Sequence, residues 1–301
     1  MNVYAGGKDI SNYIESISWS GDENQLARKM TVSYLYAPKD YTKQSIALNN
    51  GDRITMTENG KKYFEGIVIE ESTQENSSKA DGVSYDYSWY LRNKVLGAYQ
   101  GTPGSVARAV CSDNGIPAGN IYDPGGEVEI ISTGELSISK IIQNAYEGLD
   151  AHIYMDGTSL CIERYGEKLA GTVTGDDYVT DASYKSSIEN MVNRVLLLDA
   201  SEQPAGEISN GLGQFGIIQE TYKISGDEVN QRKEAEKLLK GIESSGKITV
   251  KGNPEFQTGR AIIVEKVNSR IRGRFIIISD SHSIADASYI TTLGLRFETV
   301  V

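Results

Sequence analysis

Polar and apolar residues alternate along much of this chain with the period of two that half-buried β-strands show. The clearest case is the C-terminal segment Ser288–Phe297, in which every second residue belongs to one face. That face holds Tyr289, Thr291, Leu293, Leu295 and Phe297. Two further strands, Gly259–Val264 and Arg274–Ser279, precede it, so the C-terminal end is predicted to form three consecutive strands.

An earlier segment, Gly51–Leu91, has the same order of features. It predicts strands over Asp52–Glu58 and Lys62–Glu71, joined at Asn59-Gly60, a dipeptide typical of two-residue hairpins. A third strand is predicted over Val83–Leu91. One face of this strand would hold Val83, Tyr85, Tyr87, Trp89 and Leu91. We interpret the two segments as two copies of one β unit.

The same alternation predicts further strands outside these two segments. They cover Tyr13–Ser20, Lys29–Tyr36, Tyr178–Thr180, Ser187–Ala200, Ile217–Ile224 and Lys247–Lys251. The apolar run in Ser187–Ala200 precedes the second copy as Lys29–Tyr36 precedes the first.

Helical spacing replaces the alternation at about residue 101. The first predicted helix has Thr102 as its N-cap and Pro103 at its first position, and it ends at Gly115. A second helix is expected over residues 137–147, followed by a hairpin over residues 151–165. These elements predict a small insert that leans on the β regions, because two short helices and a hairpin bury little apolar surface alone.

We therefore predict a β-rich α+β protein with two related tube-like β-barrel domains, residues 1–100 and 169–301, and a small α/β insert at residues 101–168. The second barrel domain would contain one helix, which opens with the capping-box pattern Ser225-Gly226-Asp227-Glu228. Three such chains around an axis would place six similar modules in a ring. Such an arrangement would adapt threefold to sixfold symmetry through heterologous, closing interfaces.

Composition narrows the function classes. The chain has 301 residues with 41 acidic and 30 basic side chains and a net charge of −11, whereas a surface that holds nucleic acid needs the opposite balance. The N-terminus lacks the basic and apolar regions of a signal peptide. No apolar run approaches the roughly 18–20 residues that span a bilayer. We expect synthesis in a bacterial cytoplasm without membrane insertion.

Two motifs suggest chemistry but lack the context that it requires. Gly211–Gly216 matches the G-x-G-x-x-G pattern, yet a polar loop precedes it and a strand-like run follows it, whereas a dinucleotide site links a strand to a helix. Asp280-Ser281-His282 places triad residue types side by side. Adjacent residues of an extended segment point in alternating directions, so they cannot form a triad among themselves. We interpret Ser281-His282 as part of a bend between the last two strands.

The remaining candidates are isolated. A Cys111–His152 pair would need a tertiary contact, and Cys111 falls near the apolar stripe of its helix, which is typical of a buried structural cysteine. Asp176-Asp177 and Glu70-Glu71 are adjacent acidic pairs that would face opposite sides of strands or lie in solvated turns. The two His and two Cys residues do not have the spacing of a metal site. We predict no enzyme, and no catalytic, cofactor-binding or metal site.

An ordered set of short motifs resembles the XkdQ-like baseplate hub family of contractile phage tails and R-type bacteriocins, which is related in fold to the hub proteins of phages T4 and Mu. The motifs are Arg28-Lys29-Met30-Thr31-Val32, Gly51-Asp52-Arg53-Ile54, Tyr63-Phe64-Glu65-Gly66-Ile67-Val68, Ile188-Glu189-Asn190-Met191-Val192-Asn193-Arg194-Val195, Ala235-Glu236-Lys237-Leu238-Leu239, Gly273-Arg274-Phe275-Ile276-Ile277, Ser281-His282 and the strand Tyr289–Leu295. Each motif alone has low specificity, but their order spans most of the chain.

The resemblance implies a structural protein of a contractile injection system. It implies a homotrimer that continues the tail tube above a central spike protein, with tail tube and baseplate wedge proteins as further partners. DNA or a tape-measure protein would pass through the lumen without specific binding, and the acidic balance agrees with that. The protein would be assembled in the host cytoplasm and then reside in a phage tail or bacteriocin baseplate.

Two alternatives from other classes remain open. The aromatic residues Tyr87, Trp89 and Tyr90 would suit a cell-wall or glycan-binding tail module. A wall hydrolase is the third possibility, although no pair of carboxylates stands out from the many that an acidic chain contains.

Overall fold

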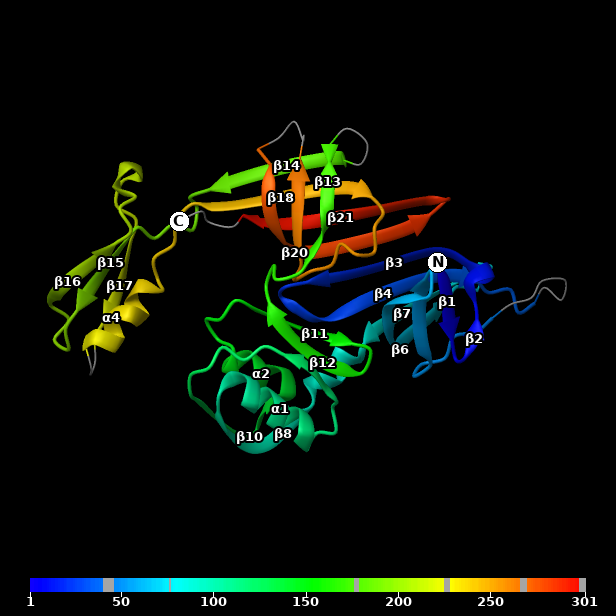
Figure 1. Cartoon of the computed structure of the whole chain (residues 1–301), viewed down its shortest axis with the longest axis horizontal. Coiled ribbons are helices and arrows are strands. Elements are labelled where there is room, and N and C mark those ends of the chain that lie inside the picture. The colour runs from blue at the N-terminus through cyan, green and yellow to red at the C-terminus, as the bar shows by residue number, and fades with distance from the viewer. Residues whose placement is uncertain (40–45, 76, 176–178, 225–227, 266–269, 298–301) are drawn as a thin grey trace. The chain divides into compact units, whose positions relative to one another are not determined.

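The computed structural model describes residues 1–39, 46–75, 77–175, 179–224, 228–265 and 270–297 (Figure 1). Strands dominate, which confirms the β-rich character predicted from the sequence. The α-helices of the described residues are α1 (Pro103–Asp113), α2 (Ile138–Ala145) and α4 (Glu228–Glu236), and none is long and apolar enough to cross a membrane. The chain divides into a larger unit, residues 1–182 with 247–301, and a smaller unit, residues 183–246.

One sheet contains 13 strands, and Figure 1 shows most of them side by side. Along its main path the order is β14-β18-β21-β20-β3-β4-β7-β6-β5-β1-β2, and β19 pairs with β13 and β20. The bounds are β1 Asn2–Ala5, β2 Lys8–Asp9, β3 Ile14–Asp22, β4 Gln25–Leu35, β5 Arg53–Glu58, β6 Lys61–Thr73, β7 Lys79–Asp86, β13 Leu169–Thr174, β14 Val179–Ser187, β18 Glu243–Lys251, β19 Ala261–Glu265, β20 Gly273–Ala285 and β21 Ser288–Phe297.

The strand order within this sheet repeats, as the sequence suggested. The first copy holds β3-β4-β7-β6-β5-β1 and the second holds β14-β18-β21-β20-β19-β13. Each strand of the first copy has the same rank along the chain as its counterpart in the second. One difference is that β1 runs antiparallel to β5, whereas β13 runs parallel to β19.

The registers of the two copies agree residue by residue. Equivalent pairs are Arg53–Ile67 and Met56–Phe64 in the first copy and Ala261–Ile276 and Val264–Gly273 in the second. Both β6 and β20 then carry one extra residue, Ile69 and Ile278 respectively, where the register against the next strand shifts. Such matched bulges indicate that the whole backbone unit, and not only its hydrophobic pattern, is duplicated.

The glycine that begins each copy of this hairpin also has the same geometry. Gly51 has φ 91° and Gly259 has φ 89°, a conformation that residues with a Cβ rarely adopt. The N–H of Gly51 donates to the carbonyl oxygen of Val68 at 2.8 Å, and that of Gly259 donates to the equivalent Ile277 at 2.9 Å.

The expectation of two separate tube-like barrels is corrected by the path of β20. This strand pairs with β19 up to Ile276, and from Ser279 onward it pairs on the same side with β3 of the first copy. The backbone groups of its second half are thus satisfied by the other copy. The result is one continuous sheet, without a closed barrel among the described strands.

Two local predictions are wrong. The strand predicted over Val83–Leu91 ends at Asp86, and Tyr87–Arg92 forms a 3-10 helix, because the Asp86 carboxylate accepts the backbone N–H of Ser88 at 3.1 Å and caps it. Ser281-His282 does not lie at a bend. β20 continues through both residues to Ala285, and the turn follows at Asp286-Ala287.

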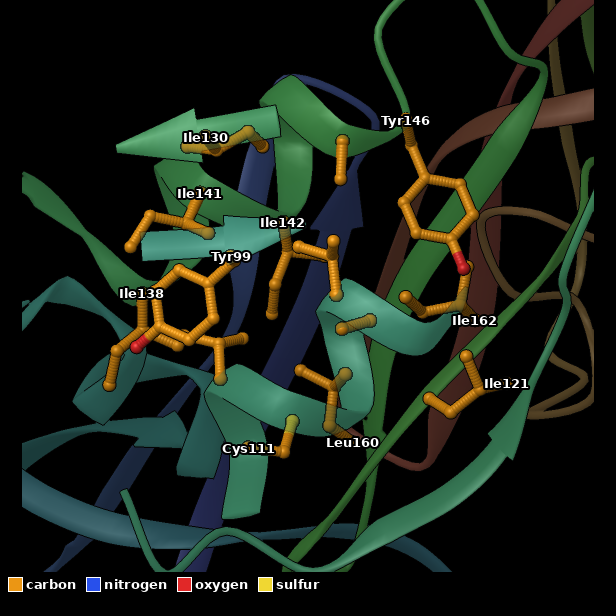
Figure 2. Packing of buried hydrophobic residues seen from close by; sticks show 14 of the residues in the cluster. Tyr99, Cys111, Ile121, Ile130, Ile138, Ile141, Ile142, Tyr146, Leu160 and Ile162 are labelled. Carbon is orange, nitrogen blue, oxygen red and sulfur yellow. The ribbon is translucent and has the colours of Figure 1, made fainter. Parts of the chain in front are cut away.

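The insert contains both predicted helices and the predicted hairpin, β11 (Ala151–Asp156) and β12 (Ser159–Arg164). Within it, β9 (Ala118–Ile121) lies parallel to β12, and β10 (Val128–Ser137) pairs with β8 (Lys94–Gly101), the strand that precedes the predicted start of the insert. Figure 2 shows how their buried side chains pack. Labelled members of this core are Tyr99, Cys111, Ile121, Ile130, Ile138, Ile141, Ile142, Tyr146, Leu160 and Ile162. The Thr102 hydroxyl accepts the Ser105 N–H at 3.2 Å, which confirms it as the N-cap of α1.

The smaller unit has a sheet of its own, in which β15 (Arg194–Leu198) lies between β16 (Pro204–Ser209) and β17 (Gln219–Lys223). Its core consists of Val192, Val195, Leu197 and Ala235. The expectation that Ser187–Ala200 corresponds to Lys29–Tyr36 is therefore wrong, since β18 is the counterpart of β4. The capping box at residues 225–227 lies outside the described residues, and α4 ends at Glu236.

Candidate functional site

The two copies of the β unit meet where β3 pairs with β20, and we call this contact the junction. Its antiparallel pairs run from Asp22–Ser279 to Ser16–Ala285. The inward face of β3 is apolar and carries the fully buried Trp19. The inward face of β20 carries two buried polar residues, Asp280 and His282, and His282 stacks on Trp19. Buried polar groups of this kind need hydrogen-bond or charge partners.

Arg28 of β4 and Asp280 form an ion pair inside the junction. Arg28 Nη1 and Nη2 donate to the two carboxylate oxygens at 2.9 and 2.5 Å, and the side chains are 16% and 0% exposed. The backbone N–H and the hydroxyl of Thr258 both donate to Asp280 Oδ1 at 2.7 Å. Burial raises the pKa of Asp280, but the Arg28 charge and hydrogen bonds from His282 and Arg28 lower this pKa well below its usual range.

His282 lies between an aromatic ring and several polar partners. Its ring stacks on the Trp19 indole with centroids 4.6 Å apart and planes 1° from parallel. If the Thr291 hydroxyl donates to Nδ1 at 3.0 Å, Nε2–H is left to donate to the Phe256 carbonyl oxygen at 3.1 Å and toward Asp280 at 3.2 Å. Both ring nitrogens are thus occupied by groups of the protein itself.

Ser281 points away from this cluster, as the alternation along a strand requires. Asp280 and His282 are buried, whereas Ser281 is exposed. A triad needs the serine oxygen within hydrogen-bond reach of the histidine ring. Asp280, Ser281 and His282 do not have that geometry among themselves.

A cleft of about 240 Å³ lies beside the junction, between β6, the β11–β12 hairpin and the loop before β19. Its charged lining residues are Arg28, Lys61, Lys62, Glu65, Asp86, Asp156, Glu163, Lys168 and Arg260. Many of these charges are already paired. Lys62 bonds Glu65 within β6, Lys168 bonds Glu163 within the insert, and Lys61 and Arg260 both bond Glu255. The Lys61–Glu255 pair joins β6 to the loop before β19, whereas the other three pairs are local.

Cys111 and His152 are not brought together. His152 lines the cleft and stacks on Tyr154 with centroids 5.3 Å apart, and burial together with the Arg28 charge lowers its pKa to about 4. Cys111 lies in the apolar core of the insert, where burial raises the pKa of its thiol to about 11. A thiol of this kind is inert as a nucleophile.

The other motifs also lack a functional setting. Within Gly211–Gly216 the chain forms a short 3-10 turn and continues into β17, so no helix follows the glycines. Glu70 and Glu71 lie in β6, and Glu71 accepts the Tyr34 hydroxyl at 3.2 Å. Asp176-Asp177 lies outside the described residues. Where the structure describes the chain, no group of three or more His, Cys, Asp or Glu residues could hold a metal ion.

Sequence reasoning missed the residues that matter most at the junction, Arg28 and Trp19. A signal was present for Arg28, because the period of two places it on the same face of β4 as Met30, Val32 and Tyr34, all fully buried. A cation on the inward face of a strand calls for a buried anion. The bulge at Ile278 shifts the alternation within β20, so the pattern did not identify Asp280 as its partner.

Several solved structures of tail proteins have a similar fold. The 43 kDa tail protein of prophage MuSo2 from Shewanella oneidensis matches with a TM-score of 0.75 at 15% identity, over 98% of this chain and 97% of that chain. A tail protein from Neisseria meningitidis MC58 also matches at 0.75 and 15%, over 99% and 96%. The type VI secretion component c3393 of E. coli matches at 0.56 and 10%, over 95% and 74%. A search of curated proteins found no match.

A family model described as YQBQ-like matches residues 17–296. This match spans both copies of the β unit, the insert and the smaller unit. Together with the shared fold, it confirms the resemblance to the baseplate hub family that the ordered motifs indicated. The chain belongs to the YQBQ-like family.

Proposed function

We propose that this protein is the structural baseplate hub of a contractile tail or R-type bacteriocin. Three chains would form a ring that adapts a sixfold tail tube to a threefold spike and continues the lumen between them. The observation that carries the proposal is the duplicated six-strand unit, whose registers and bulges agree between residues 51–86 and 259–297. A chain that presents the same backbone unit twice gives six similar positions when three copies surround one axis.

The fold likeness supports a role in a tail and suggests the partners. They would be two further copies of this chain, a tail tube protein on one side, a central spike protein on the other and baseplate wedge proteins around the ring. The c3393 structure is described as similar to the bacteriophage T4 tail proteins gp27 and gp5, which fits a position next to a spike. Assembly would take place in the host cytoplasm, before incorporation into the tail.

The charge balance supports a conduit through which a polyanion passes without being held. The net charge is −11. We expect acidic side chains to outnumber basic ones on the wall of the lumen, since like charge lowers the attraction between the wall and DNA. A threefold structure with a basic lumen would contradict this part of the proposal.

The junction itself supports a structural role. Its histidine and carboxylate are used to join β3 to β20, and Ser281 faces away from them. We therefore propose no catalytic residue, no cofactor and no metal.

A second candidate, a glycan-binding tail module, is favoured by one observation. The rings of Tyr87 and Tyr90 stack with centroids 6.4 Å apart, the Trp89 ring meets Tyr90 edge-on at 5.2 Å, and Tyr90 is 43% exposed. Exposed aromatic rings suit the apolar faces of sugars. A pull-down on peptidoglycan that retains the wild-type chain but not a Tyr90→Ala, Trp89→Ala variant would support this role.

The mass of the full chain in solution tests the hub proposal. Native mass spectrometry over a range of protein concentrations should show a species of three times the 32.9 kDa chain mass. A mass that stays at one chain throughout the range contradicts the ring. A zymogram on bacterial cell walls should show no clearing, and a clear band would instead indicate a hydrolase.

A further inference from the structure

Several strand edges of the larger sheet have no strand neighbour among the described residues, and two of them, on β6 and β14, correspond to the two edges that meet at the junction. β6 pairs with β5 as far as Ile67, and the carbonyl oxygen of the next residue, Val68, accepts the N–H of Gly51. Within the described residues no strand follows beside residues 70–73 of β6. β14 lies at one end of the sheet, and β18 is its single strand neighbour within the described part of the chain. A strand edge without a strand neighbour is a template for pairing with another strand.

The second copy shows what the β6 edge is built to meet. In β20 the pairing with β19 ends at the equivalent residues, and the next residues, Ser279–Ala285, pair with β3. Residues 70–73 of β6 are the counterparts of Ser279–His282, because both follow the matched bulge. β14 is the counterpart of β3, because each lies next to the matching strands β18 and β4. The contact already made inside the chain is therefore an example of the contact that both open edges lack.

Building on the proposed hub function, we propose that residues 70–73 of β6 pair with the outer edge of β14 in a second copy of this chain. The contact joins two different edges, so each chain still has one edge of each kind available for the next chain. Heterologous contacts of this type close into rings when the rotation permits. In a ring of three chains, junctions inside and between the chains alternate around the axis.

Burial at the two equivalent positions agrees with a missing neighbour. In β20, Asp280 and His282 are covered by β3 and its neighbours, and both are buried. In β6, Ser72 and Thr73 are exposed and Glu71 is half-buried in the single chain. Pairing with β14 of a second copy would cover this edge and satisfy its backbone groups.

Cysteine pairs across the two edges test the proposal in the full chain. Ser72 is combined in turn with cysteine at Ala182, Ser183 and Tyr184, three consecutive residues in the middle of β14. Directly opposed residues of antiparallel strands have Cα atoms about 4.5–5.5 Å apart, a distance that a disulfide can bridge. The native Cys111 and Cys161 are buried and free. As an internal control, Ser20→Cys with Ser281→Cys opposes two residues that pair within one chain.

Mild oxidation should convert at least one of the three double variants from the monomer band to covalent dimer and trimer bands on a non-reducing gel. The Ser20→Cys, Ser281→Cys control should stay a monomer with an internal disulfide, and Ser72→Cys alone should give no dimer. A trimer by native mass that gives no covalent bands with any of the three pairs overturns this inference and leaves the hub function standing. A dimer from Ser72→Cys alone, which indicates a symmetric contact between two β6 edges, also overturns it. A chain that never exceeds the monomer mass contradicts both proposals.

Discussion

The two copies of the β unit share a backbone but differ at the same place. Both have a hairpin with equal registers, a glycine near φ 90° before it and a bulge in its middle strand. After the bulge, the second copy has Asp280-Ser281-His282, packed against β3, and the first copy has Glu71-Ser72-Thr73, facing solvent. The duplicated edge is therefore paired once within the chain, in β20, and has no strand neighbour among the described residues in β6.

The side chains after the bulge also differ between the paired edge of β20 and the unpaired edge of β6. The second copy places a carboxylate and an imidazole on the buried side, where Arg28, Thr258 and Trp19 complete their contacts. The first copy has a carboxylate at the equivalent position, Glu71, which accepts the Tyr34 hydroxyl at 3.2 Å. The second copy thus uses these polar side chains inside the folded chain, whereas the first copy carries Ser72 and Thr73, small polar residues that face solvent.

The largest expected effect comes from removing the buried anion. Asp280→Ala should lower the free energy of unfolding by about 3–5 kcal/mol, because Arg28 is left as a buried charge without its partner. The matched variant in the first copy, Glu71→Ala, should change the free energy of unfolding by less than about 1 kcal/mol. The Glu71 side chain is half-buried, and its loss removes one hydrogen bond to the neutral Tyr34 hydroxyl without leaving a buried charge. Urea unfolding of both variants measures the contrast.

A double variant separates the charge from the packing. Arg28→Met with Asp280→Leu should recover much of the loss seen in Asp280→Ala, because apolar residues of similar volume often replace a buried ion pair without cost. Equal losses for Asp280→Ala and Glu71→Ala would show that the two positions are not used differently.

The next effect depends on pH and concerns Asp86 of the first copy. Phe297 occupies the equivalent position of the second copy, so a titratable group is present at this position in the first copy alone. Burial, partly opposed by Ser88 and Arg28, raises the pKa of Asp86 from 3.8 to about 6. A carboxyl with a raised pKa in the folded state favours the protonated form, so the stability that it contributes falls as pH rises from about 4 to about 6. The expected loss over this window is about 2–3 kcal/mol.

Asp86→Asn removes this titration while keeping a residue that can cap the 3-10 helix. The difference in unfolding free energy, variant minus wild type, should therefore increase between pH 4 and pH 7. Urea unfolding at several pH values measures it. A difference that stays constant with pH would mean that Asp86 does not titrate in this range.

The smallest effects concern two hairpin turns. Asn59-Gly60 has φ values of 50° and 78°, and Asp286-Ala287 has 49° and 61°. Ala287 thus occupies a left-handed conformation that costs a residue with a Cβ about 1–2 kcal/mol. Gly60→Ala should destabilise the protein by about 1 kcal/mol, and Ala287→Gly should stabilise it by a similar or smaller amount. Thermal unfolding of both variants should show shifts of opposite sign, and shifts of equal sign would contradict the backbone explanation.

Much of the β architecture could be predicted from sequence because one face of each strand is buried. The alternation in Ser288–Phe297 and the Asn59-Gly60 turn are local signals, and both are confirmed. The strand end at Asp86 was missed because Tyr87 and Trp89 fit a strand by type, while the side chain of Asp86 caps a 3-10 helix instead. Local alternation also does not specify which sheet a strand joins, as the misplaced Ser187–Ala200 shows.

The junction was harder to predict than the strands around it. Arg28 could have been noticed as a cation on a buried face, but its partner is 252 positions away along the chain and follows a bulge. A bulge reverses which residues point inward, so a period-of-two pattern fails at the point where the two copies meet. Pairing between distant strands depends on tertiary structure, which one sequence does not display.

A symmetry-resolved electron microscopy map of the assembled particle tests the hub ring most directly. We expect three copies of this chain around the tail axis, six copies of the β unit forming one ring, and β6 of each chain beside β14 of the next. A map that places this chain as a monomer away from the axis, or in a ring joined through other surfaces, would contradict it.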